Sequence, residues 1–307
     1  MSKDKMQSQA VQTTGHAWDG DLQEYNNPLP RWWVWAFYAT ILFSIVYWIY
    51  FPAWPVAKGY TPGVGKIHYV DEKGVAYTTH WNTRADLMKD LSANAKIQAP
   101  YFAKVAALPF DKIAKDPELN TFIASAGRQL FADNCASCHQ SGGAGKVGFF
   151  PNLADDDWLY GGSYETIQTT ITNGRHGYMP PFNEALTSTQ IEQLANYVLS
   201  LSGEAVDTSK ALVGNALFHS ETAAGCYYCH GPDAKGRQVL GAPNLSDKIW
   251  LWANVPGADN AAKKVAAVST IIENGVNKGV MPAWSQRLSQ EQIKVLTVYV
   301  HELGGGK

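Results

Sequence analysis

One block of sequence occurs twice in the second half of the 307-residue chain, and this duplication constrains the fold most strongly. The motif Cys-x-x-Cys-His stands at residues 135–139 and again at residues 226–230. Each motif is followed, in the same order, by a Pro-Asn-Leu segment, an Asn-Gly segment with a Met-Pro pair, and an amphipathic stretch. Matching blocks in one order indicate two copies of a single domain rather than a solenoid of many short repeats.

Both copies are predicted to be small, mostly α-helical domains, and we place them at residues 118–203 and 204–307. Apolar residues recur at helical spacing near the end of each copy, and Gly, Pro and Asn are frequent in the segments between. The recurring residues are Ile191, Leu194, Val198 and Leu201, and then Ile293, Leu296, Val300 and Leu303. A domain of this size has a marginal core. We therefore expect an apolar group to fill the centre of each copy.

Cys-x-x-Cys-His is the attachment sequence of c-type haem, in which two thiols bond the porphyrin and the histidine binds the iron. In the first copy, Cys135 and Cys138 are predicted to hold one haem, with His139 as the proximal iron ligand. The corresponding residues of the second copy are Cys226, Cys229 and His230. The sequence thus predicts two covalently bound haem c groups.

Three other uses of the cysteine pairs agree less well with the sequence. A thioredoxin-like redox pair is expected in a βαβ context, whereas these surroundings are helical and rich in loops. A four-cysteine zinc site usually draws its pairs from one short segment, but Cys138 and Cys226 are far apart in the chain. Two simple disulfides would leave the histidine that follows each pair without a role.

The distal iron ligands are predicted from the methionines. Met179 and Met281 are the only methionines after the first haem motif, one in each copy, and each lies in a Gly-x-Met-Pro segment. We therefore expect Met179 to complete the haem of His139 and Met281 to complete the haem of His230. His176 remains an alternative ligand for the first haem. With both axial positions filled by protein, neither iron is open to substrate, so no catalytic residue is predicted and the function is electron transfer.

A membrane anchor precedes the two copies. Residues 32–51 are apolar or weakly polar, and aromatic residues gather at both ends of the segment. Twenty helical residues span about 30 Å, the thickness of the hydrocarbon core. A cleaved signal peptide would have a shorter core nearer the start, so we expect an uncleaved transmembrane helix at residues 31–55. Residues 1–30 are then a polar tail, and residues 56–117 a tether and packing arm.

The predicted fold is mostly α, with one N-terminal transmembrane helix followed by two tandem class I cytochrome c-type domains. A formal net charge of −2 does not favour binding of nucleic acid. The acidic run Asp155, Asp156 and Asp157 in the first domain is either a steering site for a basic partner or a solvated loop.

The stretch "HAWDGDLQEYNNPLPRWW" (16–33), the apolar segment and "PAWP" (52–55) resemble the start of the dihaem c subunit of cbb3-type cytochrome c oxidases. The blocks "FADNCASCH", "PNLADDDWLYGG" and "NGRHGYMPPF" are also similar to that family. The resemblance implies an electron-transfer subunit of a terminal oxidase that reduces O2 to water with proton translocation. The chain itself would carry no O2-reducing centre.

The resemblance also implies partners and a location. The partners would be a catalytic subunit with b-type haems and copper, a monohaem cytochrome c subunit, and a periplasmic electron donor such as a soluble cytochrome c. The chain would cross the bacterial inner membrane once, with its N-terminus in the cytoplasm and both haem domains in the periplasm. The tail motif of His16, Trp18, Asp19, Gly20 and residues 26–33 would dock at the membrane face.

Two other functions are compatible with parts of the sequence. A membrane-anchored dihaem cytochrome of a periplasmic dehydrogenase, or a free-standing carrier, would share the haem chemistry but not the motif at residues 14–35. A haem-based sensor needs a vacant or labile axial site, which Met179 and Met281 argue against.

Overall fold

The computed structural model describes residues 12–71 and 74–304. These residues form two compact units, one that ends at Ile97 and one that begins at Gln98.

The first unit begins with a β-hairpin. Strands β1 (Thr13–Trp18) and β2 (Leu22–Tyr25) pair antiparallel around a turn with positive φ at Asp19 and Gly20. Glycine adopts such a backbone conformation without strain. The sequence predicts only a polar tail at residues 1–30, and the pattern of side chains in this segment did not predict the hairpin.

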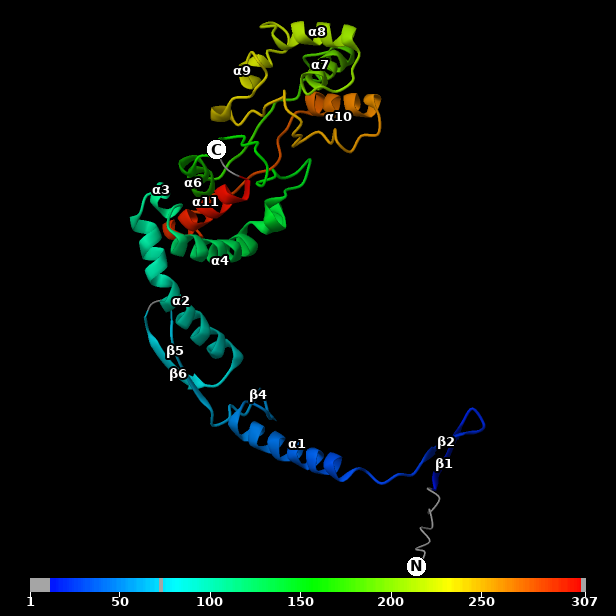
Figure 1. Cartoon of the computed structure of the whole chain (residues 1–307), viewed down its shortest axis with the longest axis vertical. Helices are drawn as coiled ribbons and strands as arrows, with labels where there is room; N and C mark the ends of the chain where they lie inside the picture. The colour runs from blue at the N-terminus through cyan, green and yellow to red at the C-terminus, as the bar shows by residue number, and fades with distance from the viewer. Residues whose placement is uncertain (1–11, 72–73, 305–307) are drawn as a thin grey trace, which may run out of the picture. The chain divides into compact units, whose positions relative to one another are not determined.

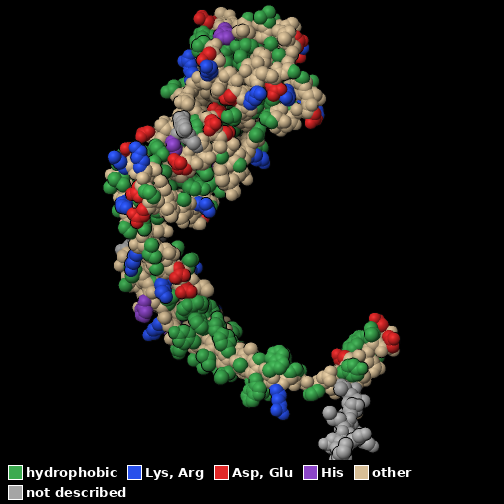
Figure 2. Space-filling model, in the orientation of Figure 1, with side chains coloured by type: hydrophobic (Ala, Val, Ile, Leu, Met, Phe, Trp, Pro, Cys, Tyr) green, Lys and Arg blue, Asp and Glu red, His purple; other side chains and the backbone are tan. Residues whose placement is uncertain are grey.

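The predicted membrane segment is one helix, α1 (Arg31–Tyr50). Its mean hydropathy is 1.5 and none of its residues is buried inside the protein, and Figure 2 shows hydrophobic side chains gathered over it. Pro30 precedes the helix and Pro52 follows it, which agrees with the expected breakers. The helix length of 20 residues corresponds to about 30 Å, enough to cross a bilayer.

Short strands and a long helix follow. Strands β3 (Pro55–Val56) and β4 (Gly59–Tyr60) form one antiparallel pair, and β5 (Lys66–Val70) and β6 (Ala76–His80) form another. Helix α2 (Thr83–Ala107) comes next.

The remaining helices of the second unit follow one another in two similar series. The first series is α3 (Phe110–Ile113), α4 (Pro117–Asn134), α5 (Ala136–His139), η1 (Ser141–Gly143), α6 (Tyr164–Asn173) and α7 (Ser188–Leu201). The second is α8 (Thr208–Phe218), α9 (Tyr227–His230), η2 (Gln238–Leu240), α10 (Ala261–Asn274) and α11 (Gln290–Gly304). Thr187 caps α7 with a capping box, and the Ser289 hydroxyl accepts from the Gln292 N–H at α11.

These helices assemble into two lobes that do not coincide with the two sequence copies. Helices α4 and α6 pack against α11, whereas α7 packs against α8 and α10 (Figure 1). We call the first group, with α5 and residues 281–288, the His139 lobe. The second group, with α9 and residues 179–186, is the His230 lobe. The predicted domain boundary at residues 203 and 204 lies between α7 and α8, two helices that pack on each other.

A glycine lies at the helix crossing in each lobe. A Cβ atom on Gly127 of α4 would come within 2.7 Å of the Tyr299 Cβ of α11. In the other lobe, a Cβ on Gly214 of α8 would meet the backbone of Gln193 and lie 2.8 Å from the Tyr197 Cβ of α7. The same Gly–Tyr contact therefore joins α4 to α11 and α8 to α7, and a larger residue at either glycine would separate the helices.

Candidate haem sites

Each Cys-x-x-Cys-His motif folds as one helical turn. Backbone hydrogen bonds run to the Cys135 carbonyl from the amides of Cys138 (3.1 Å) and His139 (2.9 Å). The Cys226 carbonyl accepts the corresponding pair, at 3.2 Å from Cys229 and 2.9 Å from His230. Residues at i, i+3 and i+4 of a helical turn share one face. The turn therefore presents two thiols and an imidazole together, as the motif predicts.

The orientation of both imidazoles is fixed by a backbone carbonyl. His139 Nδ1 lies 3.1 Å from the Pro151 carbonyl oxygen, and His230 Nδ1 lies 3.0 Å from that of Pro243. Burial lowers the pKa of both histidines, which favours the neutral ring. When Nδ1–H donates to the carbonyl, Nε2 keeps its lone pair for a metal. This is the arrangement expected of a proximal iron ligand.

The cysteine environments do not agree with the alternatives to haem. All four thiols are free, and burial raises the pKa of Cys135 and of Cys226 to about 11. A redox-active pair needs a thiolate at low pKa, so a thioredoxin-like function is not supported. Within residues 12–71 and 74–304, no group of three or more His, Cys, Asp or Glu side chains could hold a metal ion, which argues against a shared zinc site.

A buried indole N–H in the His139 lobe has no hydrogen-bond partner among the described residues, and a haem could supply one. The Trp158 Nε1 atom is buried and, among the described residues, has no hydrogen-bond acceptor. An indole N–H can only donate, and leaving such a group unpaired costs about 1–3 kcal/mol. Trp158 packs in the same apolar cluster as Cys135. A carboxylate, such as a haem propionate, would satisfy this donor, so the residues present fit a bound haem.

Each methionine segment pairs with the backbone of the other copy. The Arg175 amide donates to the Met281 carbonyl (2.9 Å), and the Met281 amide donates back to the Arg175 carbonyl (2.8 Å). The equivalent pair of hydrogen bonds joins Met179 and Val276. The Met179 amide donates to the Val276 carbonyl (2.8 Å), and the Val276 amide donates to the Met179 carbonyl (2.9 Å). Met281 then packs in the cluster of Cys135, whereas Met179 packs in the cluster of Cys226. The structure therefore brings each methionine to the cysteines of the other copy, which the sequence did not predict.

The other histidine considered as a ligand has a different partner. His176 Nε2 lies 3.0 Å from the Asn277 side-chain oxygen, again across the two copies. His176 is thus engaged at the contact between the Met segments. His219 Nδ1 lies 3.0 Å from the Asn215 carbonyl oxygen, and His219 Nε2 lies 2.8 Å from the Pro232 carbonyl oxygen.

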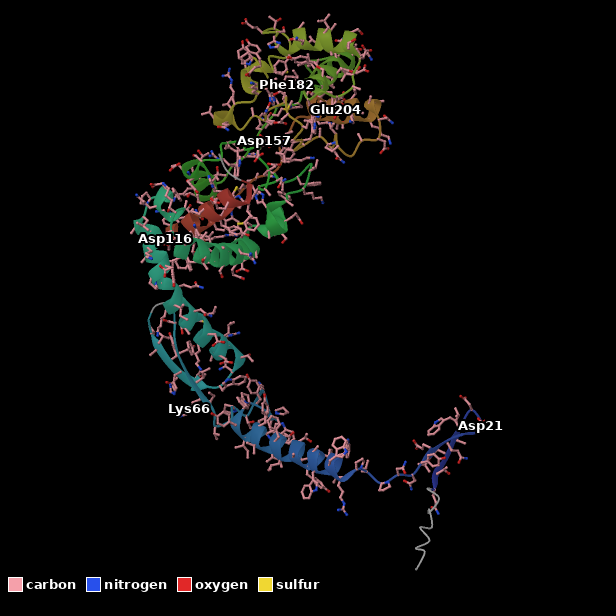
Figure 3. All side chains as sticks on the ribbon, in the orientation of Figure 1. Asp21, Lys66, Asp116, Asp157, Phe182 and Glu204 are labelled. Atoms are coloured by element: carbon pink, nitrogen blue, oxygen red, sulfur yellow. The ribbon has the colours of Figure 1, made fainter. Side chains whose placement is uncertain are left out.

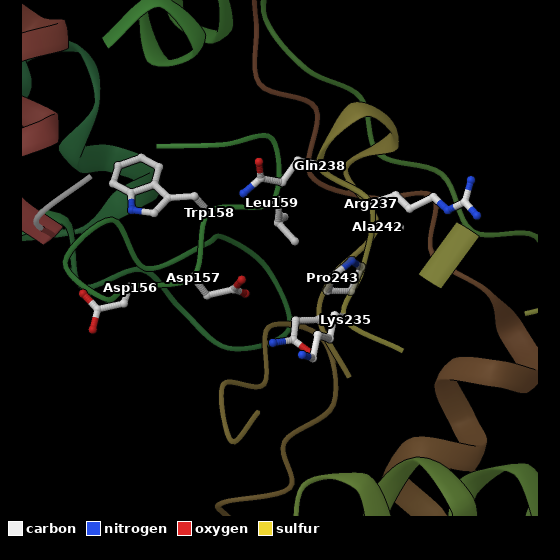
Figure 4. A pocket seen from close by; sticks show the side chains of 10 residues that line it. Asp156, Asp157, Trp158, Leu159, Lys235, Arg237, Gln238, Ala242 and Pro243 are labelled. Atoms are coloured by element: carbon white, nitrogen blue, oxygen red, sulfur yellow. The ribbon is translucent and has the colours of Figure 1, made fainter. Parts of the chain in front are cut away.

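A polar cavity of about 210 Å³ lies between residues 156–159 of the first copy and residues 235–244 of the second (Figure 4). Asp157 of the first copy points toward the side formed by Lys235 and Pro243 of the second. Burial, together with the negative charges of Asp247 and Asp155, raises the pKa of Asp157 to about 6. The acidic run is therefore partly an internal feature of the contact between copies rather than only a solvated loop.

Two family models match the chain. The N-terminal domain of cytochrome oxidase-cbb3, FixP, matches residues 10–58. The family of cbb3-type cytochrome c oxidase subunit III matches residues 123–198 and again residues 212–300. The chain belongs to the FixP/CcoP family of cbb3-type oxidase subunits. The two successive matches confirm tandem cytochrome c-type domains.

Relatives match over nearly the whole chain. The cbb3-type cytochrome c oxidase subunit FixP of Azorhizobium caulinodans is 46% identical, covering 96% of this chain and 94% of its own length. Subunit CcoP of Rhodobacter capsulatus is 41% identical over all of both chains. Subunit FixP of a Bradyrhizobium species is 43% identical, covering 96% and 95%.

Family membership confirms the predicted function at the level of the complex. The chain is a membrane-anchored cytochrome c subunit of a cbb3-type oxidase and associates with other oxidase subunits. It is an electron-transfer subunit, and the family binds haem c. The family therefore decides against the sensor and against the dehydrogenase cytochrome or free-standing carrier. The signal that identified it was the N-terminal motif, since the haem motifs alone are shared by many cytochromes.

Proposed function

We propose that the chain carries two covalent haem c groups and relays electrons from a periplasmic donor to the catalytic subunit of the oxidase. Cys135 and Cys138 would bond one haem, with His139 on its iron. Cys226, Cys229 and His230 would hold the other. The observation that carries this proposal is the pair of half-buried histidines, each fixed through Nδ1 on a proline carbonyl beside two free thiols. A bound haem supplies an iron that takes up and releases one electron.

The surrounding residues set the conditions for that electron transfer. Met179 and Met281 are the proposed distal ligands, and a thioether opposite histidine raises the potential of haem iron. The apolar clusters around Cys135 and Cys226 keep water from the sites, which also favours the less charged state of the iron. No side chain is needed to transform a substrate.

The membrane anchor defines the proposed location. We place α1 in the bacterial inner membrane, the N-terminus in the cytoplasm and both lobes in the periplasm, where c-type haem is attached. The hairpin of β1 and β2, with His16 and Trp18, is proposed to dock on the oxidase near the membrane face. The proposed partners are a catalytic subunit with b-type haems and copper and a monohaem cytochrome c subunit.

Co-purification with metal and haem analysis tests this function. The tagged chain, solubilised from its native membrane, is expected to bring haem b, copper and a second c-type cytochrome with it. A pyridine haemochrome assay of the isolated chain should give two c-type haems. The variant W18A leaves the haem region unchanged, so it should keep both haems. Less haem b and copper should co-purify with it than with the unmodified chain. Absence of haem b and copper from the unmodified preparation, or fewer than two haems in the chain, contradicts the proposal.

A further inference from the structure

We propose that an exposed apolar patch with lysines at its edge is the docking surface for an acidic electron donor of the periplasm. The patch lies in the second unit and consists of Val147, Phe149 and Val280 with Lys146 and Lys278. We call it the turn patch. The proposal rests on the proposed function and deepens it, because it names the surface that meets the donor and the charge of that donor.

The turn patch is built on a fixed backbone turn at residues 146–149. The Phe149 amide donates to the Lys146 carbonyl at 3.0 Å, and the Lys146 amide donates to the Phe150 carbonyl at 2.8 Å. Gly148 has φ of +83°, which a tight turn of this kind requires at its third residue. Val147 and Phe149 are nevertheless 47% and 51% exposed. The turn therefore holds two large apolar side chains in solvent.

The second copy completes the patch. The Gly148 amide donates to the Leu251 carbonyl at 2.6 Å. A Cβ on Gly279 would lie 3.4 Å from the Phe149 carbonyl oxygen, so the backbone of Gly279 runs beside the turn. Lys278 and Val280 flank Gly279 in the chain, and Val280 is 64% exposed. Exposed apolar side chains that gather in one place with polar residues around them mark interaction sites.

The turn patch adjoins segments that carry proposed iron ligands. The Gly145 amide, directly before the turn, donates to the His139 carbonyl at 2.8 Å. On the other side, Val280 directly precedes Met281. Electron transfer between proteins weakens steeply with distance, so a donor has to dock where such segments reach the surface. On docking, one electron passes from the reduced donor to the oxidised chain, and no bond forms or breaks.

The charge of the patch selects an acidic partner. Lys146 and Lys278 are both exposed, and Lys146 Nζ lies 4.7 Å from the centroid of the Phe149 ring. Lys248 stands three residues before Leu251, whose carbonyl accepts from the turn. Residues 146–149, 248–252 and 277–280 contain no Asp or Glu. A positive edge of this kind attracts a partner with a negative surface and repels a basic one.

The second copy has an equivalent turn with a different charge around it. Val239 and Leu240 are 92% and 52% exposed, so that turn is apolar as well. Beside it, however, Asp156 and Asp157 line the polar cavity, and Asp157 lies between the two lobes (Figure 3).

The corresponding segment beside the turn patch has lost these acids. Lys248 and Ile249 stand at the positions of Asp156 and Asp157 in the repeated Pro-Asn-Leu segment. Both copies thus keep an exposed apolar turn, but the charges beside the two turns differ. The turn patch is the more positive of the two, which makes it the choice for an acidic donor.

The size of the patch favours a transient donor over a permanent subunit. Its apolar part consists of three side chains, and charged residues begin directly at its edge. Short-lived electron-transfer complexes bury less than about 1,200 Å² in total, whereas permanent subunit interfaces are larger and more apolar. A small apolar centre inside a charged edge is the arrangement expected of an encounter that forms and dissociates at each turnover.

Binding of two cytochromes of opposite charge tests the proposal. The immobilised full-length holo chain is titrated by surface plasmon resonance with an acidic class I cytochrome c and with a basic mitochondrial-type cytochrome c. The acidic cytochrome should bind more tightly, and added salt should weaken its binding. Lys146→Glu with Lys278→Glu should weaken this binding at least about tenfold and favour the basic cytochrome. Lys115→Glu, at an exposed lysine outside the patch, is the matched control and should leave both affinities unchanged.

A second pair of variants tests the apolar centre. Val147→Ser with Phe149→Ser should weaken binding of the acidic cytochrome about tenfold, because a few apolar side chains dominate such an interface. Unlike the effect of the lysines, this loss should persist at high salt. Val239→Ser with Leu240→Ser makes the same change in the other turn and should leave the affinity unchanged. A pyridine haemochrome assay confirms that each variant keeps the haem content of the parent chain.

Several results would overturn the proposal. One is equal binding of the two cytochromes, and another is an equal loss of affinity from the variants of either turn. Binding to the isolated chain but not to the intact oxidase would show that a subunit covers the patch. Self-association that Val147→Ser with Phe149→Ser abolishes would show that a second copy does. A parent chain without covalent haem overturns the proposed function instead, and the binding data still decide the role of the patch.

Discussion

The two lobes have the same arrangement of residues around the proposed haem site but differ in the packing that supports this arrangement. In both, a one-turn helix presents the Cys-x-x-Cys-His motif, a proline carbonyl orients the histidine, and a glycine allows two helices to cross. The His139 lobe has an additional apolar layer, in which Val105 of α2 and Ile113 of α3 pack against Val295 and Val298 of α11. In the His230 lobe, ion pairs join Lys210 to Glu192 and Lys264 to Glu204.

This difference shows which part of the duplicated domain is constrained. Contacts that orient the histidine and allow the helices to cross occur in both lobes. The outer packing differs between them. Half-exposed ion pairs contribute about 0–1 kcal/mol each, whereas burying one aliphatic side chain contributes about 1.5–3 kcal/mol. The His139 lobe is therefore expected to depend less on its haem for stability than the His230 lobe.

Removing each haem in turn gives the largest effect and tests this comparison. C135S/C138S and C226S/C229S should each reduce the pyridine haemochrome count from two haems to one. Because of its additional apolar layer, the His139 lobe should remain folded in C135S/C138S. The His230 lobe should become sensitive to protease in C226S/C229S. Limited proteolysis with mass spectrometry locates the cleavage sites.

Equal protease resistance of the two variants, or greater sensitivity of C135S/C138S, would contradict the proposed difference in support. Ser137→Ala, which changes a residue between the cysteines without removing a thiol, is the control and should keep both haems.

Core truncation in α11 and α7 gives the next largest effect. Ile293 is fully buried in the His139 lobe, and Ile191, at 5% exposed, is its equivalent in the His230 lobe. Ile293→Ala and Ile191→Ala should each cost about 2–5 kcal/mol, and Ile→Val at the same sites about 0.5–1.5 kcal/mol. Because α11 packs on α4 and α6, Ile293→Ala should increase hydrogen exchange in the first copy. Hydrogen exchange by mass spectrometry measures this directly.

The matched result is expected for Ile191→Ala, which should increase exchange in α8 and α10 of the second copy. If each variant instead loosens the helices of its own copy, the described packing of the lobes is wrong.

The sequence predicted these helices but not how they pair. Ile191 and Ile293 stand at the same place in their copies, and their periodicity defines a buried face without saying which helix covers it. The Gly127 and Gly214 crossings carry equivalent tyrosines in α11 and α7, so the local pattern is identical for pairing within or between copies. Cys135 and His139 could be proposed as haem residues from the sequence because the motif that defines them is local. The Met281 contact depends on long-range topology, which no local signal encodes.

A smaller effect concerns the contact between the copies. Burial raises the pKa of Asp157 to about 6, from an ordinary value of 3.8. The native state therefore binds a proton that the unfolded chain releases, and stability falls as the pH rises from about 4 to about 6. Asp157→Asn should remove this cost and stabilise the chain above pH 6. Because the carboxyl is partly exposed, solvent screens the effect and we expect about 1 kcal/mol.

Thermal unfolding of the holo chain at pH 4.5 and pH 7 checks the sign. Asp157→Asn should raise the melting temperature more at pH 7 than at pH 4.5, and the exposed neighbour Asp156→Asn is the control. A uniform change at both pH values would show that the carboxyl titrates outside this range.

The smallest expected effect tests a difference between the surroundings of the two haems. Trp158 Nε1 is the buried donor without a partner in the described chain, and we expect it to donate to a haem carboxylate in the His139 lobe. Trp158→Phe keeps the ring and removes the donor. Because the hydrogen bond acts on both oxidation states, only its difference appears in the potential, and about 0.5 kcal/mol corresponds to about 20 mV for one electron.

The potential of the His139 haem in the C226S/C229S background provides the measurement. Removal of a donor that disperses negative charge near the iron favours the ferric state, so Trp158→Phe should lower this potential. Trp250→Phe, at the equivalent position in the His230 lobe, should leave it unchanged. An unchanged potential in Trp158→Phe would mean that the indole does not contact the haem. The two proposed haem sites would then be equivalent at this position, and the lobes would differ only in their outer packing.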